Sequence, residues 1–202
     1  MTATLAHLTN ATELDDRYPN RRVLRAQRDP MIDYLTRETD VGHAYAEAAV
    51  DHLWDRLVRH LVTRDAALRP KLSAKIETFT EADVPRYAER IVDQTLALVV
   101  ALGRNPGVTL GPSTLIDVGW HVWLLYTLER RAFEVTAFGH QLEHMPADVP
   151  GVEPITGGLD PYQLRDVTVA AIEAESDLVV DHELWSYVNG ANWNSCNSLG
   201  RG

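Results

Sequence analysis

The sequence predicts an all-α protein that folds as one domain. Apolar residues recur at three- and four-residue spacing in several long segments, and residues that begin or end helices flank these segments. No segment alternates apolar and polar residues strongly enough to predict a strand. The 202 residues, 45% of them apolar, suffice for one hydrophobic core. We therefore expect a compact bundle of about four to five main helices around a central apolar helix at about residues 114–137.

The first two expected helices are amphipathic. Asp40 can cap a helix that runs to about Val62, with an apolar stripe along one face. A second helix begins near Asp83, because Pro85 fits the first turn of a helix, where its missing N–H has no acceptor to lose. Gly103 ends this helix.

The third expected helix is the most apolar. Ser113 can cap it, and Gly139 ends it. Residues 118–128 are apolar on almost every position, which predicts that this helix is the most enclosed of the bundle.

The rest of the chain completes the domain. Asp160 and Pro161 predict the start of a fourth helix, and residues 181–188 could form a short helical turn. We expect three parts: a polar N-terminal arm over 1–30, a single helical domain over 31–188, and a flexible tail over 189–202 rich in Asn, Ser and Gly.

Charge and composition exclude several classes of protein. The net charge is −10, and a negative field repels nucleic acid, so we expect no nucleic-acid partner. The apolar stretches are too short to cross a membrane, and the N-terminus does not resemble a secretory signal. With Cys196 as the single cysteine, no internal disulfide can form. We therefore expect a soluble, cytoplasmic protein.

The strongest candidate for chemistry is a group of histidines and carboxylates in the third helix and just after it. Asp117 and His121 are four residues apart and share a helix face. Two histidines and one carboxylate form a common transition-metal site, the type that leaves positions open on iron. Iron or zinc is the expected metal, and His52 or His60 could complete the site. The candidate ligands are Asp117, His121, His140, Glu143 and His144.

Two other roles for Asp117 and His121 stay open. The pair could be a structural core pair, since we expect His121 to be buried beside Trp120, where truncation would be more damaging than at His140. The carboxylate could also orient His121 as a general base without a metal.

Two stretches, "PSTLIDVGWHVWLLYT" (112–127) and "FGHQLEHMP" (138–146), resemble a group of uncharacterised actinobacterial proteins. Their pattern joins D-x-x-W-H to a later G-x-x-[IL]-x-H-x-P and is similar to the glycine-rich-domain-containing protein-like family. The chain departs from the pattern at His140 and Glu143, and it keeps one tail cysteine where those proteins have several. The resemblance supports the helical fold and the choice of His121 and His144, and implies no particular reaction. The matching residues are Ser113, Asp117, Trp120, His121, Thr127, Gly139, His144 and Pro146.

Two functions follow as hypotheses. The first is an iron-dependent oxidation of a small molecule or peptide at the histidine–carboxylate site, with zinc-dependent hydrolysis as the next choice. No glycine-rich phosphate loop is present, so we expect no nucleotide cofactor. The alternative is a non-catalytic helical domain that binds a protein partner through its acidic C-terminal third.

Overall fold

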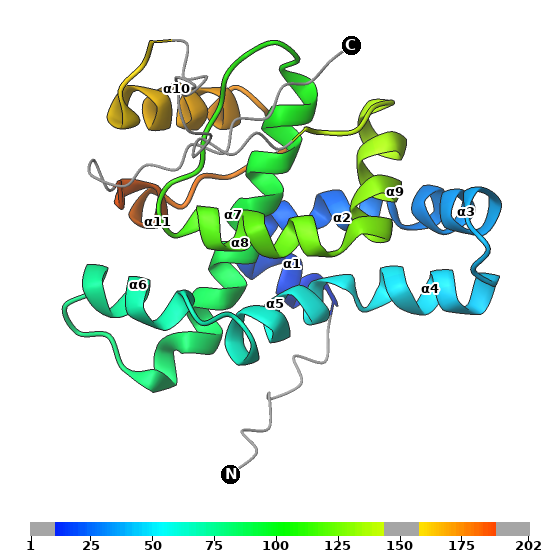
Figure 1. Ribbon diagram of the computed structural model, residues 1–202, viewed down its shortest axis with the longest axis horizontal. Coiled ribbons are helices and arrows are strands. Elements are labelled where there is room, and N and C mark those ends of the chain that lie inside the picture. The colour runs from blue at the N-terminus through cyan, green and yellow to red at the C-terminus, as the bar shows by residue number, and fades with distance from the viewer. Residues whose placement is uncertain (1–10, 144–157, 189–202) are drawn as a thin grey trace, which may run out of the picture.

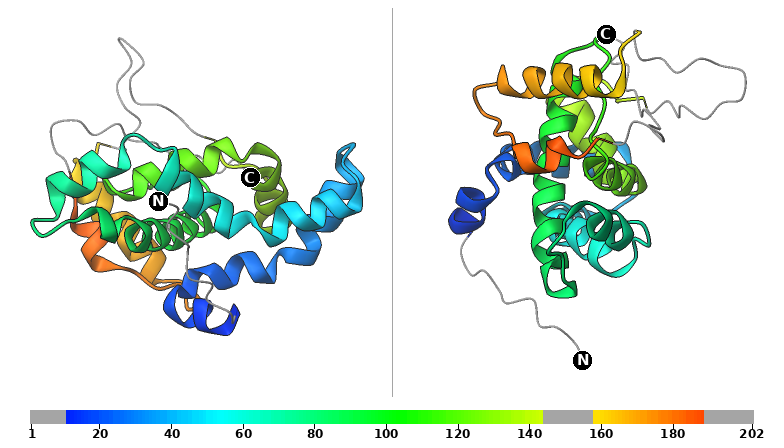
Figure 2. Two further views of the ribbon diagram at one scale, coloured as in Figure 1. Left: turned by 90° about the horizontal axis from the view of Figure 1, so that it is seen from below. Right: turned by 90° about the vertical axis from the view of Figure 1, so that its left-hand side faces the viewer.

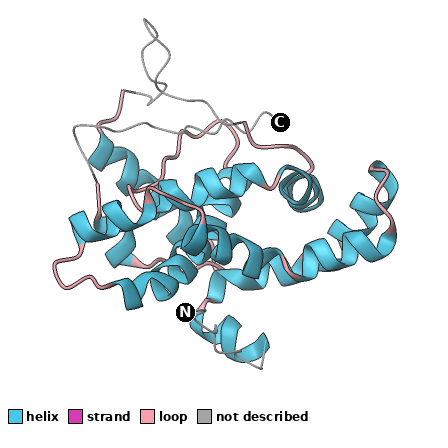
Figure 3. Ribbon diagram, turned by 60° about the horizontal axis from the view of Figure 1, so that its bottom comes forward, coloured by secondary structure: helices cyan, strands magenta, loops and turns pink. Residues whose placement is uncertain are grey.

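The structure is a computed structural model that describes residues 11–143 and 158–188. These ranges contain helices and no strand, which confirms the all-α prediction (Figures 1 and 3). The α-helices are α1 (Ala11–Arg17), α2 (Arg22–Ala26), α3 (Arg28–Glu38), α4 (His43–Asp51), α5 (Leu53–Thr63), α6 (Leu68–Lys75), α7 (Val84–Arg104), α8 (Ile116–Leu125), α9 (Thr127–Phe138), α10 (Pro161–Glu173) and α11 (His182–Ser186). Two short 3-10 helices are η1 (Pro19–Arg21) and η2 (Glu81–Asp83).

Helix α7 runs through the middle of the molecule (Figure 1). It starts at Val84 with Pro85 in its first turn and ends at Arg104, close to the predicted bounds. Residues 96–101 are each at most 1% exposed, so the most enclosed stretch lies here rather than in residues 118–128. Other helices surround α7, with α5 and α8 on one side and η1 and α10 on the other (Figure 2).

The contact between α7 and α8 is very close at one glycine. A Cβ atom on Gly119 would lie 2.1 Å from Thr95 Oγ1 and 2.7 Å from Ile91 Cγ2. Such distances leave no room for a side chain at this position. Gly119 therefore sets how closely α8 approaches α7.

A buried polar network lies on the opposite side of α7. Asn20 donates to Asp93 Oδ2 at 2.7 Å and accepts from the Val179 backbone N–H at 2.8 Å. Gln94 Oε1 accepts from Trp185 Nε1 at 2.8 Å. Because these partners come from both ends of the sequence, the network joins the N-terminal and C-terminal segments to α7.

The expected polar arm over residues 1–30 is wrong for the part that the structure describes. Residues 11–30 form α1, η1, α2 and the start of α3. Tyr18 is 3% exposed and Asn20 is 0% exposed. The sequence pattern does not predict this packing, because the segment has few apolar residues and its buried side chains Tyr18 and Asn20 are amphipathic and polar. Residues 1–10 lie outside the described residues.

Two of the long helices expected from the sequence are each two helices. The first is interrupted at His52, between α4 and α5, and the third at Tyr126, between α8 and α9. Tyr126 has φ −89° and ψ 61°, outside the helical region. Its hydroxyl donates to the backbone carbonyl of Arg56 at 2.9 Å, a contact with a distant helix that sequence spacing cannot reveal. Likewise α4 packs on α3, whereas α5 packs on α7 and α8.

The C-terminal elements agree with the prediction. Asp160 caps α10 by accepting from the backbone N–H groups of Tyr162 and Gln163, and Pro161 is its first residue. Residues 182–186 form the short helix α11. Within the described ranges, no helix combines the length and the apolar character that a membrane span requires.

Candidate functional site

The structure corrects the expected burial of His121. Its side chain is 49% exposed, although Trp120 and Trp123 beside it are buried. Leu125, four residues later on the same face of α8, is 64% exposed. One face of this apolar helix is therefore open to solvent. The sequence does not predict this exposure, because residues 118–128 are apolar on almost every position.

Asp117 and His121 do lie together, as their spacing predicted. His121 Nδ1 is 2.8 Å from the backbone carbonyl oxygen of Asp117 and 3.5 Å from its carboxylate Oδ1. The other carboxylate oxygen is 3.4 Å from Lys71 Nζ. The pair is thus a surface arrangement in which Asp117 is shared between an imidazole and an ammonium group, not a core pair.

The chain after α9 folds back on that helix through a buried carboxylate. Glu134 is 0% exposed and accepts the backbone N–H of Leu142 at 2.9 Å. Burial raises the pKa of Glu134, and the hydrogen bond from Leu142 opposes that rise. His140 packs beside this turn, with Nδ1 3.1 Å from the Phe138 carbonyl oxygen.

The metal site stays a prediction. Glu143 is exposed, and His144 lies outside the described residues. Among the residues that the structure describes, no group of three or more His, Cys, Asp or Glu side chains is arranged to hold a metal ion. His52 is exposed, and His60 lies at a different feature, a cavity beside α5.

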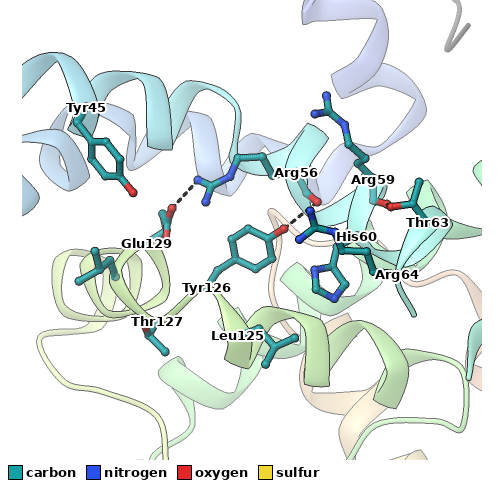
Figure 4. Close-up of a pocket in the computed structure, with 11 residues that line it drawn as sticks. Tyr45, Arg56, Arg59, His60, Thr63, Arg64, Leu125, Tyr126, Thr127 and Glu129 are labelled. Atoms are coloured by element: carbon teal, nitrogen blue, oxygen red, sulfur yellow. Dashed lines mark hydrogen bonds and ion pairs between the residues drawn. The ribbon is translucent and has the colours of Figure 1, made fainter. Parts of the chain in front are cut away.

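This cavity lies between α5 and the junction of α8 with α9, and its volume is about 520 Å³ (Figure 4). That size is within the range of small-molecule sites. The chain leaves the helical conformation at Tyr126, and the cavity lies beside this break. The lining residues are Tyr45, Arg56, Arg59, His60, Thr63, Arg64, Leu125, Tyr126, Thr127, Leu128 and Glu129.

Three side chains form a fixed floor for this cavity. The Arg56 guanidinium lies 4.9 Å from the centre of the Tyr126 ring and 2.5 Å from Glu129 Oε1. Tyr126 in turn donates to the Arg56 carbonyl oxygen (Figure 4). Glu129 is only 5% exposed, and a buried carboxylate destabilises the fold unless a positive group such as that of Arg56 compensates its charge. Burial raises the pKa of Tyr126, and the arginines nearby oppose that rise.

The remaining basic groups are not neutralised in this way. In the described ranges, neither Arg59 nor Arg64 has a carboxylate oxygen within 4.0 Å. The Arg64 guanidinium lies beside the Tyr126 hydroxyl, whereas that of Arg59 points away from the ring at the cavity's edge (Figure 4). His60 meets Tyr126 edge-on, with ring centroids 6.0 Å apart.

A second hollow, of about 200 Å³, shows the contrasting arrangement. Its three arginines all have carboxylate partners: Arg21 and Arg25 pair with Asp15, and Arg28 pairs with Asp51. Each guanidinium of the second hollow therefore lies against a carboxylate, although Arg21 and Arg25 share that of Asp15. The cavity beside α5 is different because Arg59 and Arg64 have no carboxylate partner in the part of the chain that the structure describes.

Sequence reasoning missed this cavity, although part of its signal was present. Arg56, Arg59 and His60 occur at helical spacing, off the apolar stripe of the same helix, and Arg64 follows four residues later. From the sequence, His60 is the one residue of this face that we considered for a site, as a further ligand of the metal. Only the three-dimensional structure places Tyr126 and the start of α9 against it.

No family model, curated protein or solved structure matches the chain. The resemblance to the glycine-rich-domain-containing protein-like family therefore stays a prediction. The function is inferred from the geometry of the site alone.

Proposed function

We propose that the protein binds a small anionic ligand in the cavity between α5 and the α8–α9 junction. The observation that carries the proposal is that Arg59 and Arg64 line a cavity of about 520 Å³ without a carboxylate partner in the described ranges. Guanidinium groups are well suited to hold carboxylates and phosphates, because their donors form a planar fork.

The charge of the whole chain strengthens this reasoning. The net charge is −10, and most arginines in the described ranges lie within 4.0 Å of a carboxylate. Two arginines without such a partner at one cavity run against this trend. An anion bound there would meet a local positive field on an otherwise negative molecule.

The surrounding side chains would limit where the anion sits. Glu129 repels a negative charge at its end of the cavity, although Arg56 offsets much of this effect. The anion is therefore placed at the other end, beside Arg64 and His60 (Figure 4). Arg56 is paired with Glu129, and Tyr126 is hydrogen-bonded to the Arg56 carbonyl oxygen. These two side chains therefore form the base of the cavity and do not hold the anion.

The test is calorimetric titration of the full chain with inorganic phosphate at low ionic strength. Arg64→Gln should raise the Kd at least about tenfold, equivalent to about 1.4 kcal/mol. The matched control is Arg131→Gln, since Arg131 is exposed on α9 and lines neither hollow. Its Kd should stay within about twofold of the parent value.

Two results would contradict the proposal. One is no detectable binding of phosphate by the parent protein. The other is an equal loss of affinity in Arg64→Gln and Arg131→Gln, which would mean that the anion responds to total charge rather than to the cavity.

A further inference from the structure

We infer that the ligand of this cavity is a phosphate monoester whose organic group is flat and apolar, such as an aromatic ring. The inference rests on the proposed function, because it names the class of anion that the same cavity takes. Three features of the cavity lead to it: its charge, the directions of its donors and its apolar rim.

The charge of the cavity favours a dianion. Arg59 and Arg64 are two cations without a carboxylate partner in the described ranges, whereas the charge of Arg56 is met by Glu129. A phosphate monoester carries about 1.5 to 2 negative charges at neutral pH, and a carboxylate carries one. Arg64 brings its guanidinium to the anion, and Arg59 adds a second positive charge at the edge of the cavity, so the local potential favours the more highly charged phosphate monoester over a simple carboxylate (Figure 4).

The donors of the cavity approach from two sides. Arg64 and His60 come from α5 and the residue after it, while Thr127 lines the opposite wall, at the start of α9. One planar carboxylate is satisfied by a single arginine fork, whereas the three terminal oxygens of a phosphate accept bonds from several directions.

The rim of the cavity is apolar at two exposed side chains. Leu125 is 64% exposed and Tyr45 is 54% exposed. Leu125 lies beside Tyr126 and His60, and Tyr45 lies at the end opposite Arg64 (Figure 4). Covering such side chains removes apolar surface from water, which favours binding. An organic group that extends from the phosphate across Leu125 and Tyr126 toward Tyr45 would cover them.

The experiment compares three probes by calorimetric titration at one ionic strength: inorganic phosphate, phenyl phosphate and benzoate. Phenyl phosphate should bind at least about tenfold more tightly than either of the others. Leu125→Gln should remove most of the advantage over inorganic phosphate. Val179→Gln is the matched control, since Val179 is 51% exposed and does not line the cavity, and it should keep that advantage.

The possible failures separate the two proposals. Equal affinity for phenyl phosphate and inorganic phosphate, with Arg64→Gln still weakening both, would overturn the apolar group and leave the proposed function standing. Benzoate that binds as tightly as phenyl phosphate would overturn the phosphate. Absence of binding by all three probes would overturn the proposed function itself.

Discussion

Helix α8 contributes to two very different regions of the molecule. At Gly119 it meets α7 so closely that a single added carbon would lie 2.1 Å from Thr95 Oγ1. At its other end, past Leu125, it opens onto a cavity lined by charged and aromatic side chains. The first region uses the smallest side chain to exclude space, and the second uses large side chains to enclose it. A single apolar segment can therefore contribute both to a tightly packed helix contact and to a polar cavity, depending on where the helix ends.

The largest expected effect is on the packed side of the molecule, at Asp93. Burial raises the pKa of Asp93 to about 7, above its unfolded value of 3.8. The folded state therefore holds the proton between these two pH values, and the stability contributed by protonation is lost as pH rises from about 4 to about 7. This loss should be on the order of a few kcal/mol.

The measurement is urea unfolding of the parent and of Asp93→Asn at several pH values between about 4 and 8. The difference in free energy of unfolding between the two proteins should change over that interval. Asp16→Asn is the control, because Asp16 is an exposed residue whose side chain is 71% accessible. Parallel stability curves for the parent and Asp93→Asn would show that Asp93 does not titrate differently in the folded state.

The next effect sharpens the packed contact itself. Gly119→Ala should destabilise the protein by about 1–3 kcal/mol, because the new methyl group collides with Thr95 and Ile91. Thr95→Ala removes the closest of these atoms, so the double variant should lose less than the sum of the two single variants. Chemical denaturation of all four proteins measures this coupling. Simple additivity would mean that α8 moves away from α7 without strain.

A smaller effect on stability is expected for substitutions of His140 and His121. His140 should matter more than His121, which is the opposite of the sequence-based expectation. His140 is half-buried next to Phe138, so His140→Ala should reduce stability by about 1 kcal/mol. His121 is 49% exposed, so His121→Ala should change stability by less than about 0.5 kcal/mol. Thermal unfolding of both variants gives the comparison, and a larger loss in His121→Ala would restore the original expectation. If His121 is a metal ligand, added Zn²⁺ or Fe²⁺ should raise the Tm of the parent but not of His121→Ala.

The smallest effect on stability is expected at the cavity. Arg64 is exposed and has no carboxylate partner in the described ranges, so Arg64→Gln should leave the free energy of unfolding within about 0.5 kcal/mol of the parent value. This result, together with weakened phosphate binding, would show that the residue serves the ligand rather than the fold. A clear loss of stability would instead assign Arg64 a structural role.

The elements that sequence predicted well are those with local signals. Pro85 marked the start of α7, and Asp160 with Pro161 marked α10, because capping and proline geometry depend only on neighbouring residues. The break at Tyr126 has no local signal, and it coincides with a hydrogen bond from the Tyr126 hydroxyl to Arg56, 70 residues away. Tertiary contacts of this kind override local helix preference.

The candidate site was harder to predict for the same reason. The histidine–carboxylate spacing correctly placed Asp117 beside His121, yet it could not show that this face of α8 meets solvent. The cavity draws on three separate stretches, around Tyr45, over residues 56–64 and over residues 125–129. No local pattern shows that these stretches converge.

The network around Asn20 also has a consequence for how the chain folds. Asn20 and Val179 are bonded across 159 positions, so this contact closes a loop of most of the chain. Contacts of such long sequence separation lose much chain entropy when they form, and they slow folding. During synthesis, the polar face of α7 cannot find its C-terminal partners until the last helices leave the ribosome. Asp93 can reach Asn20 and the Arg21 backbone N–H earlier, because both precede it in the chain, whereas Gln94 has to wait for Val179 and Trp185. The contact between the two ends of the domain is therefore expected to form late in folding.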